Sequence, residues 1–249
     1  MMRFRRWPAG MLILLTLATI TVAAAPAAEA RARKPKPPPP NYASGIDASH
    51  WQGTINWTQV AGAGKTFVFL KATEGTAYAD PTYAGNRSGA RAAGIKVGAY
   101  HFAQPDATPG DAVAEAQWFL SKASFASDDL RPVLDIEVNG GLSVSALQQW
   151  VRDWLDEIYR QTGRRATIYT SPSFWSSSMG NTQSIALAGY TTLWIANWGV
   201  SSPSVPAGNW AGYGWSFWQY SSTGSVSGIS GSVDLDRANS TDLTPFLFG

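Results

Sequence analysis

The 249-residue sequence predicts an α/β fold, a single-domain β/α barrel of modified form. Short apolar runs alternate with longer segments of helical spacing from residue 44 onward, which is the pattern of a parallel sheet covered by helices. The alternation extends over roughly 200 residues, a length typical of one closed barrel. Because the last third is rich in Gly, Pro and Ser, we expect a TIM-like barrel that is incomplete in helices and has partly antiparallel closing strands.

Apolar runs bounded by turn residues are predicted to be strands, and amphipathic segments to be helices. The predicted strands are Gly45–Ser49, Phe67–Ala72, Val97–Phe102, Pro132–Val138, Ala166–Thr170, Leu193–Ala196 and Ser216–Tyr220. The predicted helices are Asp80–Ala93, Thr108–Ser124 and Ser143–Thr162, with Pro109 and Ser143 at starting positions and Gly94 and Gly163 at stops. Residues 198–214 carry no periodic segment of helical length.

The chain is expected to begin with a signal peptide and a spacer. Residues 1–30 carry arginines before an apolar run, Met11–Ala25, and end in Ala28-Glu29-Ala30, a small-x-small cleavage pattern. A membrane anchor would need about 18 or more apolar residues. Residues 31–43 form a basic, Pro-rich leader that we expect to be disordered. Residues 44–249 are then the one folded domain, secreted and without a membrane anchor after cleavage.

The folded part is mildly acidic although the whole chain is basic. From residue 41 onward, twelve Lys and Arg stand against sixteen Asp and Glu, whereas the full chain has a net charge of +2. A nucleic-acid-binding face would have to be clearly positive, so no nucleic acid is expected as a partner. With no cysteine and only His50 and His101, disulfides and the usual zinc sites are excluded. No metal or cofactor is expected.

Asp135 and Glu137, in the run VLDIEV, form the candidate catalytic pair. Two residues apart in a strand, they would point to the same side with Cα atoms roughly 6 to 7 Å apart. Their neighbours are apolar, and acids in such an interior position are costly unless a site uses them. A D-x-E pair is common by itself. This one, however, stands at the carboxyl end of a predicted barrel strand, where barrel enzymes place their active sites.

Two more acids stand at strand ends. Asp47 closes GID in the first predicted strand, and Asp234 lies in VDLD after the last one. Asp47 could instead cap a turn or helix, and Asp234 and Asp236 could belong to a C-terminal loop. Acids gathered at the strand ends of one barrel repel each other unless a site uses them. The sequence therefore predicts that Asp47 and Asp234 join Asp135 and Glu137.

The chain has 12 tryptophans, and flat indoles can cover a sugar ring while acids bind its hydroxyls. Eight lie in or near predicted loops and strand ends: Trp51, Trp57, Trp175, Trp194, Trp198, Trp210, Trp215 and Trp218. About half of these are expected to serve packing instead. Trp118, Trp150 and Trp154 recur at helical spacing and are expected in the core. The mixture of acids and aromatics favours an oligosaccharide ligand.

Both histidines are interpreted as structural. His50 is expected to have a polar partner, and His101 should face away from Tyr100 and Phe102 within its strand. Lys71 and Glu74, in KATEG, are expected to pair with each other and to fix a loop. They are assigned no chemistry.

Eight sequence blocks, taken together and in order, resemble the lysozymes of glycoside hydrolase family 25, the Chalaropsis-type N-acetylmuramidases. They are GIDASHWQG, FLKATEG, GAYHFAQP, PVLDIEV, IYTSPSFW, LWIANW, FWQYSS and SGSVDLD, from Ser44 to Asp236. The resemblance implies a modified β/α barrel that cleaves the β-1,4 bond from N-acetylmuramic acid to N-acetylglucosamine in bacterial peptidoglycan. An exported chain without disulfides fits a bacterial, actinobacterial source.

The resemblance also implies roles for individual residues. It makes Glu137 the proton donor and Asp135, Asp47 and Asp234 the other acids of the site. Residues in matching blocks that are expected to contact sugar are Tyr100, Tyr169, Trp194 and Gln219. Asp135 could be the nucleophile, or it could orient the substrate's own N-acetyl group as the nucleophile. The substrate-assisted route is favoured, although strand spacing does not fix the distance between the two carboxyl groups.

The expected function is that of a secreted, monomeric muramidase acting on peptidoglycan strands, and two rival functions fit the sequence less well. Chitinases of the barrel type carry a D-x-x-D-x-D-x-E run, which is absent because residues 131–134 before Asp135 are Arg-Pro-Val-Leu. A binding protein that has lost catalysis is disfavoured because all four acids are present.

Overall fold

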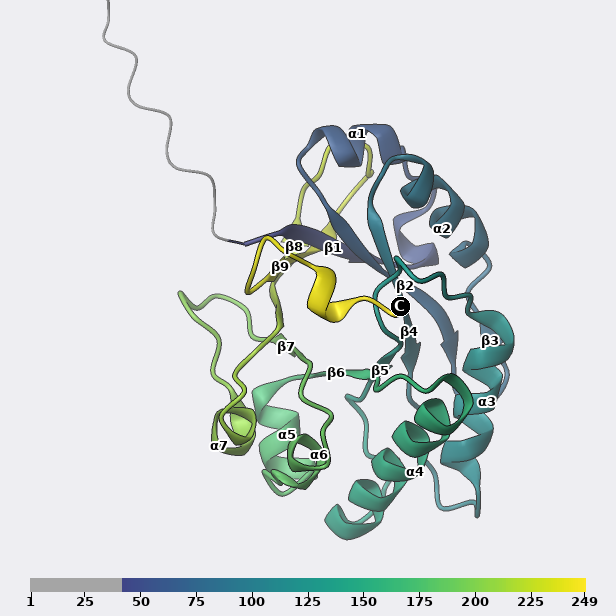
Figure 1. Cartoon of the computed structure of the whole chain (residues 1–249), viewed down its shortest axis with the longest axis vertical. Coiled ribbons are helices and arrows are strands. Elements are labelled where there is room, and N and C mark those ends of the chain that lie inside the picture. The colour runs from purple at the N-terminus through teal and green to yellow at the C-terminus, as the bar shows by residue number, and fades with distance from the viewer. Residues whose placement is uncertain (1–41) are drawn as a thin grey trace, which may run out of the picture. The chain divides into compact units, whose positions relative to one another are not determined.

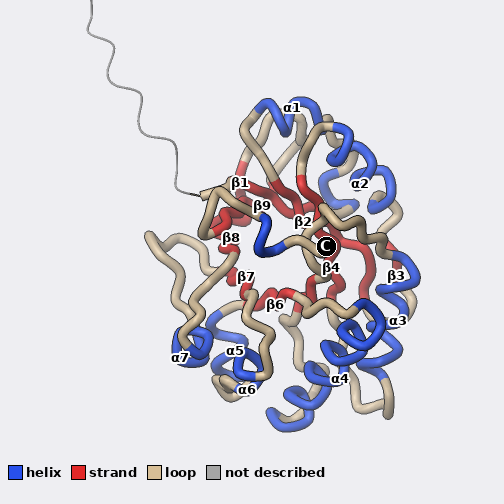
Figure 2. The backbone as a smooth tube through the Cα atoms, in the orientation of Figure 1, coloured by secondary structure: helices blue, strands red, loops and turns tan. Residues whose placement is uncertain are grey.

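The computed structural model describes residues 42–249. The predicted signal peptide, and all of the predicted leader except Tyr42 and Ala43, lie outside the described residues. In Figure 1, the strands of the described part surround a central space and the helices lie outside them. Figure 2 shows the same arrangement with the strands in red and the helices in blue.

Nine strands make one sheet. They are β1 (Ser44–Ala48), β2 (Phe67–Glu74), β3 (Tyr78–Ala79), β4 (Lys96–Phe102), β5 (Val133–Asp135), β6 (Thr167–Thr170), β7 (Leu193–Ala196), β8 (Phe217–Gly224) and β9 (Val233–Ala238). The order is β1-β9-β8-β7-β6-β5-β4-β2-β3, and pairing of β1 with β2 closes the barrel. Only β9 is antiparallel to both of its barrel neighbours, β1 and β8. The predicted fold, a modified barrel with partly antiparallel closure, is confirmed.

The helices follow the prediction where they are long. The helical elements are α1 (Trp57–Gly62), α2 (Tyr83–Ala92), α3 (Asp111–Lys122), α4 (Val144–Thr162), α5 (Pro172–Ser178), α6 (Ser184–Leu187), α7 (Pro206–Ala211) and the 3-10 turns η1 (His50–Gln52) and η2 (Thr244–Phe246). Ser143 caps α4 by accepting from the Ala146 N–H, and Gly163 ends it with a φ of 68°. Within residues 198–214, α7 is a short turn with positive φ from Ala207 to Ala211, so amphipathic spacing could not reveal it.

Two further corrections concern strands beside the predicted acids. The strand expected over Pro132–Val138 is only Val133–Asp135, so Glu137 lies just beyond its end. VDLD, expected to follow the last strand, belongs to a strand of its own, β9. Val233 and Leu235 alternate with the two acids and pack on the outer face of the barrel, so the acids face inward.

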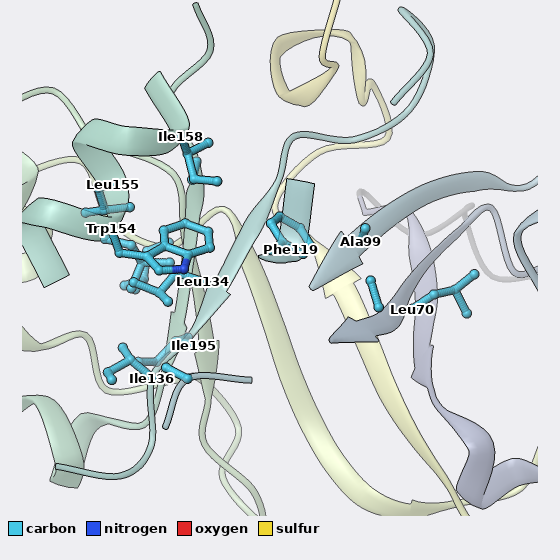
Figure 3. Close-up of a cluster of buried hydrophobic side chains, with 14 of the residues drawn as sticks. Leu70, Ala99, Phe119, Leu134, Ile136, Trp154, Leu155, Ile158 and Ile195 are labelled. Carbon is cyan, nitrogen blue, oxygen red and sulfur yellow. The ribbon is translucent and has the colours of Figure 1, made fainter. Parts of the chain in front are cut away.

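Alternation along the strands divides the core into two clusters. Outward strand side chains such as Leu134 pack with helix side chains such as Trp154 of α4 and Phe119 of α3, all labelled in Figure 3. Inward side chains such as Phe67 and Phe217 fill the barrel interior. Figures 1 and 2 show the C-terminal segment with η2 crossing the centre of the strand ring, and the rings of Phe246 and Phe217 pack 4.8 Å apart between centroids. The amino ends of the strands are thus filled with apolar groups.

Candidate active site

A cavity of about 190 Å³ lies at the carboxyl ends of the barrel strands. Its lining contains all eight predicted site residues, which are Asp47, Asp135, Glu137, Asp234, Tyr100, Tyr169, Trp194 and Gln219. The other lining residues are Ser49, Trp51, Lys71 and Phe102. The structure therefore brings together residues that are up to 187 positions apart in the chain (Asp47 and Asp234).

Strand geometry explains why the acids meet. Asp47 on β1 and Asp234 on β9 are register partners, so their side chains leave the same face of the sheet. Asp135 is the last residue of β5, where it pairs with Phe102 and Tyr169 on the neighbouring parallel strands. Since residues on alternate positions share a face, these side chains all point into the barrel.

The Asp135 and Glu137 carboxyl groups lie close enough for each to change the pKa of the other. Asp135 is buried, with 6% of its surface exposed, whereas Glu137 is exposed. Burial raises the pKa of Asp135 well above its usual range, and the charge of Glu137 adds to the rise. The pKa of Glu137 is raised as well, mainly by desolvation. Because the pKa of each acid is raised, this pair holds a proton at a higher pH than isolated acids would.

Asp135 also has a free oxygen that could accept a hydrogen bond from a ligand. Its Oδ1 is buried and has no hydrogen-bond partner among the described residues. Buried polar atoms are rarely left without a partner. An N–H or O–H group in the cavity could supply the missing hydrogen bond.

Gln219 joins the other two acids of the cavity. Its Nε2 donates to Asp47 Oδ2 at 2.7 Å and to Asp234 Oδ2 at 3.3 Å. Its Oε1 accepts from Tyr169 Oη at 3.0 Å and from Trp198 Nε1 at 2.9 Å. Burial raises the pKa of Asp47 well above its usual range, and the charges of neighbouring acids raise it further. The buried amide therefore fixes two carboxyl groups and one indole.

Lys71 is the functional candidate that sequence reasoning missed. The predicted pair is present, since Lys71 Nζ lies 2.5 Å from Glu74 Oε2, but Lys71 also lines the cavity. Its ammonium group lies 4.9 Å from the centre of the Phe102 ring. Its positive charge lowers the pKa of Asp135 and so opposes the effect of burial. The inward position of residue 71 in β2, shared with Phe67 and Phe69, was the available signal.

Asp236 is a second missed residue. It lies two positions after Asp234 on β9 and is fully buried. Its Oδ1 accepts from Trp194 Nε1 at 2.9 Å. The only position that the sequence suggests for Asp236 is in a C-terminal loop.

A second hollow of about 460 Å³ lies beside the cavity, and Glu137 lines both. Trp198, from the segment after β7, borders this hollow and is 53% exposed. On the β1 side, Trp51 borders the acidic cavity and is 81% exposed. Exposed indoles therefore stand at two places along the hollowed surface around Glu137. Trp194 and Tyr169, by contrast, are almost completely buried.

The remaining aromatic predictions hold in part. Five of the eight tryptophans near strand ends are buried: Trp57, Trp175, Trp194, Trp210 and Trp218. Trp150 and Trp154 are core residues as predicted. The prediction that Trp118 is a core residue is wrong, because Trp118 is only half-buried and its indole N–H donates to the Tyr78 carbonyl.

Both histidines have structural partners, as predicted. His50 Nδ1 lies 2.9 Å from Asp80 Oδ2. His101 points away from the cavity and is hydrogen-bonded to Thr73 and Glu115 at 2.8 and 2.7 Å. Within residues 42–249, no group of three or more His, Cys, Asp or Glu is placed to hold a metal ion. The same residues contain no helix long and apolar enough to cross a membrane.

Comparison with known proteins assigns the family. The profile of "Glycosyl hydrolases family 25" matches residues 46–229. The chain belongs to glycosyl hydrolase family 25. This family 25 chain is 44% identical to Lysozyme M1 of Streptomyces globisporus over 204 residues, which cover 78% of the chain and 67% of the relative. It is 35% identical to the N,O-diacetylmuramidase of Chalaropsis sp., over 76% of the chain and 95% of the relative.

Solved structures agree with this assignment. The bacterial lysozyme from Streptomyces coelicolor matches with a TM-score of 0.73 and 42% identity, over 79% of this chain and 92% of that one. A family GH25 lysozyme from Aspergillus fumigatus matches with a TM-score of 0.74 and 31% identity, over 84% and 100% of the two chains. The chain is therefore a glycoside hydrolase, and the predicted family is confirmed.

Proposed function

We propose that this glycoside hydrolase is a secreted N-acetylmuramidase. It hydrolyses the β-1,4 bond between N-acetylmuramic acid and N-acetylglucosamine in bacterial peptidoglycan. The observation that carries the proposal is the Asp135–Glu137 pair, which lines a cavity with two further acids and stands beside a hollow bordered by Trp198. The relatives named lysozymes and muramidases support the substrate class.

Glu137 is the general acid. Cleavage of a glycosidic bond requires a proton on the leaving oxygen. Glu137 is the exposed member of the pair and borders both the cavity and the hollow, so it can reach a bond that lies across them. Lys71 favours the negative charge on Asp135. Once substrate excludes water, this bias favours a protonated Glu137 beside an ionised Asp135.

Asp135 orients the N-acetyl group of the substrate. Its partnerless, buried Oδ1 is suited to accept the amide N–H of that group. With the N–H held in this way, the acetamido oxygen can attack the anomeric carbon, and a water molecule activated by Glu137 later opens the cyclic intermediate. Both steps invert the anomeric centre, so the net outcome is retention.

Asp47 and Asp234 complete the acidic wall of the cavity. The charge of Asp234 favours the positive, oxocarbenium-like transition state and also helps to keep Glu137 protonated. Gln219 fixes the geometry of both acids. Tyr100, Tyr169 and Trp194 belong to the wall as well. The exposed Trp51 and Trp198 are the surfaces on which flanking sugars stack.

The general acid is tested by Glu137→Gln, with Asp153→Asn on the exposed face of α4 as the control. Clearing of Gram-positive cell walls by E137Q should fall at least about a hundredfold, the lower end for loss of a general acid. The control should retain wild-type clearing. Mass spectrometry of the soluble products should find N-acetylmuramic acid at the reducing end. A glucosamine reducing end, or full activity of E137Q, would contradict the proposal.

The role of Asp135 has its own test. NMR should detect the β-anomer as the first product, since both routes through Asp135 retain configuration. An analogue whose reactive sugar carries a free amine instead of the acetamido group should not be turned over. Turnover of that analogue with retention of the anomeric configuration would contradict the substrate-assisted route and favour direct attack by Asp135. Inversion of the anomeric configuration would exclude both routes.

Secretion and monomeric state are also part of the proposal. The sequence of residues 1–30 supports export, with cleavage after Ala30. N-terminal sequencing of protein from the culture medium should find Arg31 first. Light scattering of that protein should give the mass of one mature chain. Protein that stays with the cells at full length, or a dimer mass, would refute the corresponding statement.

A further inference from the structure

Trp198 reaches from the open hollow to the buried acids of the cavity. The residue is 53% exposed and borders the hollow beside Glu137. Its Nε1 nevertheless donates to Gln219 Oε1 at 2.9 Å, and Gln219 is only 2% exposed. Much of the indole is therefore open to a ligand, while its N–H edge belongs to the hydrogen-bond network that holds Asp47 and Asp234.

The backbone before Trp198 is fixed to strand β8. The Asn197 N–H donates to the Gln219 backbone carbonyl at 3.1 Å, and the Asn197 carbonyl accepts from Trp218 Nε1 at 2.8 Å. The Asn197 side chain accepts from the Ser204 N–H at 2.8 Å, which holds the two ends of the intervening loop together. The indole of Trp198 is thus kept beside Gln219 by contacts other than its own hydrogen bond.

The indole N–H decides which way the Gln219 amide points. A side-chain amide has an oxygen that accepts and a nitrogen that donates, and a half-turn about its last bond exchanges the two. An indole N–H can only donate, so it must face the oxygen. The Tyr169 hydroxyl, 3.0 Å from the same oxygen, can donate or accept and would tolerate either orientation. Trp198 therefore selects the orientation in which Nε2 faces the two acids.

The acids alone do not impose this orientation. An ionised carboxylate accepts only, but a protonated carboxyl group also donates and could pair with the amide oxygen. Burial raises the pKa of Asp47 well above its usual range and raises that of Asp234 as well. Of the four side chains that bond to the Gln219 amide within the described part of the chain, only that of Trp198 can never accept.

We propose that Trp198 is a positioning residue as well as a sugar-stacking surface, because its indole N–H holds the Gln219 amide in the orientation that directs both amide hydrogens at Asp47 and Asp234. The inference rests on the proposed function, in which Trp198 stacks a flanking sugar and the two acids face the substrate. One side chain then connects sugar binding in the hollow with the alignment of acids in the cavity. A sugar that covers Trp198 also keeps water from this hydrogen bond and so strengthens it during the reaction.

The test compares wild type, Trp198→Phe, Trp198→Ala and the control Trp118→Phe on soluble peptidoglycan fragments. Trp118 is a matched control because its indole also donates at 2.9 Å, to the Tyr78 carbonyl, and because it lines neither the cavity nor the hollow. W118F loses an indole N–H outside the site, so its kcat and KM should stay within about twofold of wild type.

The split between kcat and KM separates positioning from stacking. W198F keeps an aromatic face and loses the N–H, so kcat should fall by about tenfold while KM stays within about threefold of wild type. W198A loses the face as well, so it should combine the same fall in kcat with a KM that is about tenfold higher. A W198F variant with wild-type kcat would leave Trp198 only a stacking surface and would overturn the inference.

A double variant shows whether Trp198 acts through Gln219. Gln219→Leu removes the amide, so the indole N–H has nothing left to orient. Adding Trp198→Phe to Q219L should therefore change kcat by less than about twofold, although the same substitution lowers kcat about tenfold in the wild-type background. Losses of kcat that multiply, as expected of residues that act independently, would overturn the inference.

NMR spectroscopy tests the same hydrogen bond without any turnover. The Gln219 side-chain N–H protons, assigned by their absence from spectra of Q219L, should exchange with solvent at least about tenfold faster in W198F than in wild type or W118F. If exchange is faster in W198F while E137Q remains active, the proposed function fails and positioning by Trp198 stands. If E137Q is inactive and W198F equals wild type in exchange and in kcat, the inference about Trp198 alone fails.

Discussion

Asp47 on β1 and Asp234 on β9 stand directly opposite each other in an antiparallel strand pair, and one amide, that of Gln219, donates to both carboxyl groups. Like charges in directly opposed positions weaken a strand pair. The Gln219 amide counteracts this by using both of its hydrogens on the two acids. Its oxygen, held by Tyr169 and Trp198, prevents the amide from turning over. The closing strands of the barrel therefore tolerate an acidic pair because of a residue on the adjacent strand β8.

Gln219→Leu should impair both activity and stability. The substitution removes four hydrogen bonds at a position that is only 2% exposed and leaves their partners unsatisfied. We expect a loss of stability of about 1 to 3 kcal/mol and at least a tenfold fall in kcat/KM. Thermal denaturation and glycan hydrolysis measure the two effects. The matched control is Gln149→Leu on the exposed face of α4, and equal behaviour of the two variants would refute the bridging role.

The free energy of unfolding should fall as pH rises from about 4 to about 8. Burial raises the pKa of Asp47, Asp135 and Asp236 in the folded state, the last to about 8, whereas in the unfolded chain they titrate near 4. Between these values the folded state binds more protons than the unfolded state, so raising the pH favours unfolding. Calorimetry should find a higher Tm at pH 5 than at pH 8, with a smaller difference in D236N.

Two other acids, Glu157 and Asp128, limit the stability of the fold at the acidic end of the pH range. The guanidinium group of Arg160 holds the pKa of Glu157 at about 2, and Arg91 and Lys96 do the same for Asp128. For these groups the folded-state pKa is lowered, so their contribution is present above about pH 4 and is lost as pH falls toward 2. The Tm should therefore decline again in strong acid. A Tm that rises steadily from pH 5 to pH 8 would contradict the assignment of the buried protonated acids.

Period-2 alternation made much of the site predictable. Asp47 is the last residue but one of β1 and Asp135 is the last residue of β5, and the carboxyl ends of parallel strands meet at one end of a barrel. This rule alone places the two acids together although 88 positions separate them. The same alternation correctly predicted that His101 points away from the cavity.

The features that were missed depend on contacts that no local pattern encodes. Asp236 occupies an inward position in β9 where alternation leads one to expect an apolar residue. Only the tertiary neighbours Trp194 and Asp47 make an acid tolerable there. Likewise, a partner for Lys71 was predicted in Glu74, but its nearness to Asp135 follows from barrel closure and not from the KATEG motif.

Trp51→Ala should weaken substrate binding without slowing the bound reaction. The indole is 81% exposed at the edge of the acidic cavity, so little of its surface serves the fold. Loss of one stacking surface should raise KM by about three- to tenfold and leave kcat within about twofold. The control is Tyr213→Ala, an aromatic residue that is 59% exposed and lines neither the cavity nor the hollow. A fall in kcat with unchanged KM would show that Trp51 acts in another way.

Lys71→Met should shift the acidic side of the activity profile to higher pH. The ammonium group lowers the pKa of Asp135, so removing it lets burial and the charge of Glu137 raise that pKa further. Asp135 would then be neutral over more of the acidic range. It could not accept the substrate N–H as a carboxylate there, and kcat should fall most at low pH.

Two companion variants assign this effect to charge. Lys71→Arg keeps the positive charge beside Glu74. Its activity should therefore depend on pH in the acidic range as that of wild type does. Glu74→Gln removes the partner of Lys71 but leaves the ammonium group beside the cavity. It should therefore shift the acidic side of the activity profile to lower pH, since the charge of Glu74 itself raises the pKa of Asp135. Opposite shifts for K71M and E74Q are the signature of an electrostatic effect, whereas shifts in the same direction would mean that the pair acts only by fixing the loop after β2.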